Sequence, residues 1–146
     1  MATFGEWQFE CDPEATILAY SDVEQGGAEG CTCNGCRNFV AARGRVFPKA
    51  FLEFLATVGV DPLKDAEAYH VARLAPGCHA YGGWFHFVGQ LNVDGDFGVV
   101  DFGDGFTACL CSASAPRLGS FEGLSVVQLE FQAEAVPWML SEPERT

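Results

Sequence analysis

Apolar and polar side chains alternate near both ends of the chain, the pattern of β-strands that are buried on one face. Near the start, Trp7, Phe9 and Cys11 alternate with glutamate and glutamine. Residues 126–134 repeat the pattern, with their glutamine and glutamate side chains expected in solvent. Residues 16–21 and 67–74 are also expected to be strands, with a short helix as the alternative for 67–74.

Two helices are predicted in the first half of the chain, after a polar, glycine-rich loop over residues 22–30. Asn34 is a favoured N-cap for a helix that runs to about residue 43, where Gly44 ends it. Pro48 suits the first position of a second helix, and Gly59 suits its C-terminal end. Between them, apolar side chains recur at helical spacing on one face: Phe51, Phe54, Leu55 and Val58.

Three apolar stretches in the second half of the chain predict an antiparallel meander. They are residues 84–93, 96–103 and 106–112, joined by Asp94-Gly95 and Asp104-Gly105. Asp-Gly between strands favours a type I′ hairpin turn, because both central positions take positive φ. The expected fold is therefore α+β, a single domain over residues 1–146. In it, the meander and flanking strands form one antiparallel sheet and two helices pack on one side. The polar tail, residues 141–146, is expected to fray.

Composition and charge narrow the class of protein. The chain has 146 residues, 49% hydrophobic and 19% charged, which is enough apolar material for a core and excludes disorder. With 8 basic and 20 acidic residues, the net charge is −12. This charge repels polyanions and argues against nucleic-acid binding, although it could steer a basic protein partner. No apolar run is long enough to span a membrane, so no membrane association is expected.

The chain contains an odd number of cysteines, so they cannot all pair in disulfides. They stand at positions 11, 31, 33, 36, 78, 109 and 111. The N-terminus lacks the basic and apolar segments of a secretory signal, so we expect a cytoplasmic protein with reduced thiols. Clustered thiols in that setting indicate metal or redox chemistry.

The cluster Cys31-Thr32-Cys33-Asn34-Gly35-Cys36 is the strongest candidate site. Zinc prefers four tetrahedral ligands, and three cysteines on a turn that enters a helix could supply three of them. The helix N-terminus lowers thiol pKa values and so favours the thiolate form. The fourth ligand is not fixed by the sequence, and its candidates are Cys11, Cys78, His79 and His70. Redox-active thiols and inert, partly buried cysteines are the two alternatives.

The remaining chemistry-bearing residues have simpler interpretations. In the register of the meander, Cys109 and Cys111 face the core and act as small hydrophobic side chains. His86 lies on the opposite face of its strand, and a Cys36–His86 nucleophile–base pair is a further alternative. Residues 92–96 have the opening spacing of a calcium loop but lack its later Gly and Glu, so a hairpin turn is predicted there.

Three segments in the middle of the chain form a distinctive combination. They are Cys31-x-Cys33-x-x-Cys36-x-Asn38-Phe39, then Val60-Asp61-Pro62-x-Lys64 with Glu67-x-Tyr69, and Tyr81-x-x-Trp84-x-His86-Phe87-Val88-Gly89. Over residues 31–89 the chain thus resembles a family of small bacterial proteins that carry no assigned function. The resemblance implies a shared fold, and it brings no activity, cofactor or catalytic residue with it.

The sequence therefore predicts an acidic, soluble, non-enzymatic bacterial protein with a structural zinc ion at Cys31, Cys33 and Cys36. Such an ion would fix the glycine-rich loop on the first helix and add to the folding free energy. Two other classes stay open. One is a small Cys/His thiol enzyme or redox protein, and the other is an acidic interaction module of the immunity type that binds a basic protein. The sequence does not indicate an oligomeric state.

Overall fold

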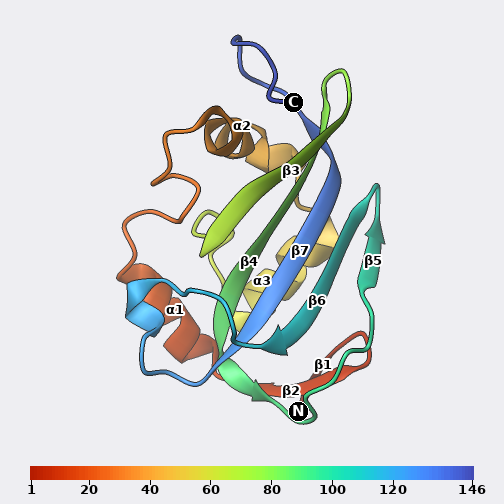
Figure 1. The fold of residues 1–146 in the computed structure, drawn as a ribbon. Coiled ribbons are helices and arrows are strands. Elements are labelled where there is room, and N and C mark those ends of the chain that lie inside the picture. The colour runs from red at the N-terminus through yellow and green to blue at the C-terminus, as the bar shows by residue number, and fades with distance from the viewer.

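A computed structural model describes residues 1–146. Seven strands form one antiparallel sheet, and three α-helices pack beside it (Figure 1). The strands are β1 (Ala2–Phe4), β2 (Trp7–Cys11), β3 (Glu67–Ala75), β4 (Cys78–Leu91), β5 (Val100–Gly103), β6 (Phe106–Ser112) and β7 (Val126–Pro137). The helices are α1 (Pro13–Ser21), α2 (Asn34–Ala42) and α3 (Lys49–Val58), with short 3-10 turns η1 (Arg43–Arg45) and η2 (Gly119–Phe121). The α+β class with an antiparallel sheet is confirmed. None of the helices is both long and apolar enough to cross a membrane.

The order of the strands differs from the expected meander. The sheet runs β1-β2-β4-β7-β6-β5, and β3 pairs with β4 on the edge away from β7. β7 therefore lies between β4 and β6. Only the second Asp-Gly turn joins paired strands, with Asp104 at φ 53° and Gly105 at φ 75° between β5 and β6. The segment around Asp94-Gly95 is irregular, so the predicted first hairpin is wrong.

Helices α2 and α3 cover one face of the sheet and begin within a residue of their predicted starts (Figure 1). Phe39 of α2 lies 6.2 Å, centroid to centroid, from Phe131 of β7, and Phe51 of α3 lies 4.7 Å from Phe106 of β6. All four rings are buried. Gly59 ends α3 with a left-handed φ of 86°, as its position in the sequence predicts.

Residues 16–21 lie in helix α1, so the strand predicted there is wrong. Asp12 caps this helix with its side chain. The helix fills the gap between β3 and β2 along one edge of β4 (Figure 1). There the Tyr20 hydroxyl donates to the His86 carbonyl at 2.7 Å, and the Thr16 hydroxyl accepts a main-chain N–H of β4 at 2.9 Å. These bonds replace the strand pairing that this part of the edge lacks.

Strand β6 faces the core with Phe106 and Leu110, not with its cysteines. Because β6 pairs with β7, Cys109 lies opposite Glu130, and the Cys111 thiol donates to that carboxylate at 3.2 Å. Burial and this contact raise the pKa of Cys111 to about 12. The predicted facing of both cysteines is therefore wrong: they are half-buried on the opposite face, where Cys109 still packs against the hydrophobic cluster.

His86 also lies on that opposite face, as predicted from its position between two core phenylalanines. Its Nε2 lies 3.1 Å from the side-chain oxygen of Gln128. Gln128, expected in solvent, is buried because the segment after β6 folds over it, and the main-chain N–H groups of Ser114 and Ala115 donate to the same oxygen.

Candidate metal centre

The loop that leads to the cysteine cluster is fixed by glycines that let two main chains touch. The Gly27 amide donates to the Asp65 carbonyl at 2.8 Å, and the Ala28 amide donates to the Asp65 carboxylate at 3.1 Å. A Cβ on Gly26 would lie 2.8 Å from the main-chain nitrogen of Asp65, so no side chain fits there. The glycine-rich loop is thereby held against the segment that precedes β3, which positions Cys31 at its end.

The three clustered cysteines gather at the first turn of α2. Cys33, one residue before the predicted Asn34, is the N-cap, and its Sγ accepts the Cys36 N–H at 3.4 Å. The Cys31 thiol donates to Cys33 Sγ across 3.3 Å. The Cys36 thiol points toward β3, where it lies 4.0 Å from the Ala68 carbonyl oxygen. The three sulphur atoms all lie within 4.8 Å of one another.

This spacing fits a thiolate-bound metal ion. Zn–S bonds of about 2.3 Å at tetrahedral angles place sulphur atoms about 3.8 Å apart. The sulphur separations here, 3.3 Å at one pair and no more than 4.8 Å at any, bracket that value. Cys33 is exposed and the other two are half-buried, so an ion can reach all three from solvent.

At the first turn of α2, the pKa values of Cys33 and Cys36 shift in opposite directions. Accepting the Cys36 N–H, with smaller effects from the Cys31 thiol and the Arg145 charge, lowers the pKa of Cys33 to about 7. Burial raises the pKa of Cys36 well above its usual range. One thiol is therefore half ionised near neutral pH, while its neighbour stays protonated until a metal or a reaction takes the proton.

Of the four predicted candidates for a fourth ligand, two lie elsewhere. Cys11 ends β2, which stands at the end of the sheet opposite α2 (Figure 1). Cys78 is at the β3–β4 hairpin, and its thiol donates to the Glu134 carbonyl at 3.4 Å.

The two remaining candidates, His70 and His79, are neighbours on β3 and β4. His79 is buried, with Nδ1 2.8 Å from His70 Nε2 and Nε2 2.8 Å from a Glu144 carboxylate oxygen. His70 lies beside the first turn of α2, since a Cβ on Gly35 would be 3.3 Å from the His70 Cβ. The structure thus brings one histidine next to the cysteine cluster, with the second behind it.

The Cys36–His86 pair is not brought together. His86 lies on the face of the sheet opposite the core, whereas α2 packs on the core face through Phe39.

The C-terminal tail, expected to fray, is instead tied to helix α2, which begins at the cysteine cluster. Arg37 donates to both carboxylate oxygens of Glu142, at 3.0 and 2.7 Å, and to the Thr32 carbonyl at 3.0 Å. This pairing lowers the pKa of Glu142. Buried Asn38 accepts the Met139 N–H at 2.6 Å and so ties α2 to the start of the tail. Asn38 is a residue of the quoted motif and Arg37 fills one of its open positions, but the partners of both lie too far along the chain for spacing to reveal.

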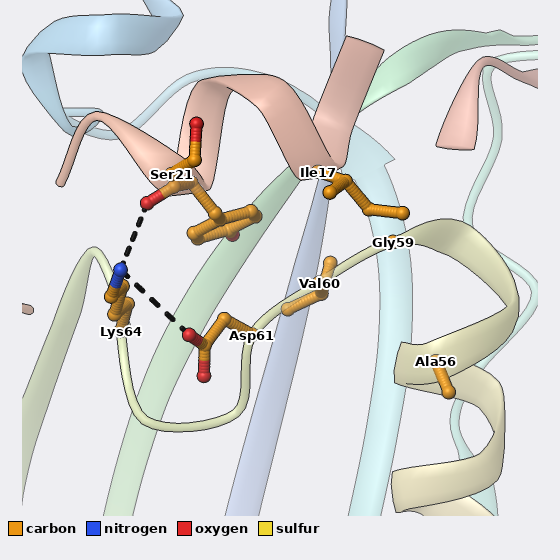
Figure 2. Close-up of a pocket in the computed structure, with 8 residues that line it drawn as sticks. Ile17, Ser21, Ala56, Gly59, Val60, Asp61 and Lys64 are labelled. Atoms are coloured by element: carbon orange, nitrogen blue, oxygen red, sulfur yellow. Dashed lines mark hydrogen bonds and ion pairs between the residues drawn. The ribbon is translucent and has the colours of Figure 1, made fainter. Parts of the chain in front are cut away.

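A separate pocket lies between α1 and the end of α3 (Figure 2). Its polar groups satisfy one another, because the Lys64 ammonium donates to the Tyr20 carbonyl at 3.0 Å and lies 3.8 Å from Asp61. The remaining lining residues include Ile17 and Val60, and none is a cysteine or histidine. The pocket therefore adds no reactive or metal-ligating group to the cysteine cluster.

Comparisons with known proteins indicate no function, so the function is inferred from the geometry of the site. No protein-family model, curated protein or solved structure matches the chain. The resemblance over residues 31–89 to small bacterial proteins therefore stays a prediction.

Proposed function

We propose that this protein binds one zinc ion through the thiolates of Cys31, Cys33 and Cys36, and that the ion has a structural role. The observation that carries the proposal is the convergence of the three sulphur atoms within 4.8 Å. Cys33 is exposed, so its thiol is held beside the other two by its hydrogen bonds with Cys31 and Cys36 and not by burial in the core. Zinc accepts thiolate ligands at this spacing.

The proposed ion would join three parts of the fold. Cys31 ends the glycine-rich loop, Cys33 caps α2, and Cys36 faces β3. The unfolded chain has no preformed site, so the free energy of zinc binding adds to the free energy of unfolding. Structural zinc supplies on the order of 10 kcal/mol in small peptides. This chain has its own aromatic core, so we expect zinc to stabilise a fold that already forms without it.

Metal analysis of untagged protein, purified without added metal, tests the proposal. We expect one zinc per chain and its loss in Cys33→Ser. The matched control is Cys78→Ser, because Cys78 lies outside the cluster. Zinc should raise the denaturation midpoint of the wild type and of the control but not that of Cys33→Ser. Metal-free protein that takes up no added zinc would contradict the proposal.

A second candidate function is thiol–disulfide exchange by Cys33 and Cys36. The observation that favours it is the exposed Cys33 with a pKa lowered to about 7, followed by a more buried Cys36 with a raised pKa. In such a reaction, the Cys33 thiolate attacks a substrate disulfide and displaces one thiolate. The Cys36 thiol then loses its proton, attacks Cys33 and releases the second substrate thiol, so two electrons pass to the substrate.

Alkylation kinetics at neutral pH separate the two candidates. A free Cys33 thiolate should react much faster than Cys78, whether or not a chelator is present. Zinc-bound thiolates should be protected until a chelator removes the ion. The acidic interaction module stays a prediction from the net charge of −12.

A further inference from the structure

A chain of three side chains leads from the C-terminal tail to the cysteine cluster. Glu144 Oε1 contacts His79 Nε2 at 2.8 Å, and His79 Nδ1 contacts His70 Nε2 at 2.8 Å. Glu144 is itself held, since it accepts the Gly77 N–H at 2.7 Å and pairs with Arg73 at 3.2 Å. His79 is fully buried, so no solvent competes for its two ring nitrogens.

These contacts fix the tautomers of both histidines when the rings are neutral. The hydrogen bonds from His79 and Gly77 lower the pKa of Glu144, so its carboxylate only accepts. His79 must therefore carry its proton on Nε2 and accept at Nδ1. His70 must then carry its proton on Nε2, which leaves a lone pair on Nδ1.

His70 lies beside the cysteine cluster, where a lone pair on Nδ1 can serve as a metal ligand. It follows Ala68 by two residues on the face of β3 that Cys36 approaches, and Gly35 lies directly against it. A Cβ at position 35 would press on the His70 Cβ at 3.3 Å, so glycine permits the close contact between helix and strand. The Arg145 guanidinium reaches the same place, with Nη1 3.3 Å from that Cβ position.

We propose that Nδ1 of His70 is the fourth ligand of the zinc ion, with His79 and Glu144 as the residues that position it. This inference rests on the proposed function. Zinc-binding histidines typically donate their second ring N–H to a fixed acceptor, which sets the tautomer and strengthens the ligand. Three thiolates and a neutral imidazole leave a zinc site with one negative charge, which Arg145 is placed to offset.

The ligands must move closer together to hold the ion. His70 is outside the group whose ligand atoms all lie within 4.8 Å of one another, so zinc draws the first turn of α2 and the His70 ring together. The two elements already touch at Gly35, so this movement is local.

Long-range ¹H–¹⁵N NMR of the wild-type protein tests the proposal without a variant. Before zinc is added, His70 and His79 should both show the Nε2–H tautomer. One equivalent of zinc should shift the His70 Nδ1 resonance strongly and leave both His79 nitrogens in their tautomer. A His70 Nδ1 that carries a proton, or that does not respond to bound zinc, would overturn the proposal.

Zinc titrations of variants give a second, independent measurement. Glu144→Gln should weaken zinc binding by about 10–100-fold, the usual effect of losing a positioning partner. His70→Ala should weaken it further, while Cys78→Ser should leave it unchanged. Urea unfolding of the metal-free variants shows whether each still folds.

The two proposals fail in different ways. If zinc binds with unchanged affinity to His70→Ala and is lost only in Cys33→Ser, the three-thiolate site stands and the His70 ligand is wrong. If no variant and no wild-type protein binds zinc, both are wrong.

Discussion

Replacing Gly27 with alanine tests whether contact between the glycine-rich loop and the segment before β3 positions the cysteines. The Gly27 and Ala28 amides both donate to Asp65, at 2.8 and 3.1 Å. An added Cβ would press on the Ala66 carbonyl group, with the carbonyl carbon at 3.0 Å, and would lie 3.2 Å from the Glu67 Cα. These are main-chain atoms that cannot rotate away, so the loop must lift.

The expected decrease in the free energy of unfolding follows from the two hydrogen bonds that the displaced loop breaks. The bond to the Asp65 carbonyl is worth about 1 kcal/mol, and the bond to its carboxylate about 1.5–3 kcal/mol. Residual crowding adds about 1–3 kcal/mol. The terms overlap, because a loop that lifts relieves crowding as it breaks bonds, so we expect a loss of about 3–4 kcal/mol. Zinc affinity should fall with it, since the same loop carries Cys31.

Urea unfolding of the metal-free protein, followed by far-UV circular dichroism, measures this loss. The matched control is Gly44→Ala, because a Cβ there meets nothing within 4 Å and needs no left-handed φ. We expect the control to be neutral or to gain about 0.4–1 kcal/mol. If Gly27→Ala lost no more stability and no more zinc affinity than the control, the loop contact would not be what positions Cys31.

Three further changes test other parts of the fold. Phe51→Ala removes a fully buried ring and should cost about 3–5 kcal/mol in guanidinium unfolding. Tyr20→Phe removes the hydroxyl that donates to the β4 edge at 2.7 Å and should cost about 1–2 kcal/mol in the same assay. The lowered pKa of Glu142 means that its pairing with Arg37 stabilises the tail above the ordinary glutamate pKa and is lost as pH falls through the lowered value. Fluorescence of Trp138, whose indole donates to the Glu142 carbonyl at 3.0 Å, should therefore change below about pH 4 and not in Glu142→Gln.

Helices and strands with strong local patterns were predictable from the sequence. α2 and α3 follow caps and apolar spacing that lie within a few residues, and so does the alternation of β2 and β7. Helix α1 was missed because its nine residues, Pro13–Ser21, form no clear apolar face. Its contact with the β4 edge depends on the hydroxyl groups of Thr16 and Tyr20. The facing of Cys109 and Cys111 was wrong because it assumed an unbroken ladder from β4 through β5 to β6. The β5–β6 pairing instead has a register shift between Asp101 and Gly103, and β7 is the strand that joins β6 to β4.

The cysteine cluster was predictable from spacing, but its surroundings were not. Three thiols within six residues can converge on one point, and the structure places them within 4.8 Å. The groups that shape the cluster come from residues far along the chain. Arg37 and Glu142 are 105 residues apart, and His79 and Glu144 are 65 apart. Such pairs form only because β7 pairs with β4, and no local sequence pattern predicts that pairing.

The two Asp-Gly dipeptides offer a direct test of the hairpin turns predicted from the sequence. From the sequence they are equivalent hairpin turns, but only Gly105 has a left-handed φ, of 75°, and a Cβ there would lie 3.1 Å from the Glu134 Cβ. At Gly95 φ is not left-handed, and the nearest atom to an added Cβ is in the Phe97 ring at 3.4 Å, an ordinary contact. Gly105→Ala should therefore lose about 1–2 kcal/mol in urea unfolding, the cost of a left-handed alanine, while Gly95→Ala should lose almost nothing. A loss at Gly95 as large as that at Gly105 would mean that residue 95 has a left-handed φ, as in the predicted first hairpin, and would contradict the irregular segment between β4 and β5.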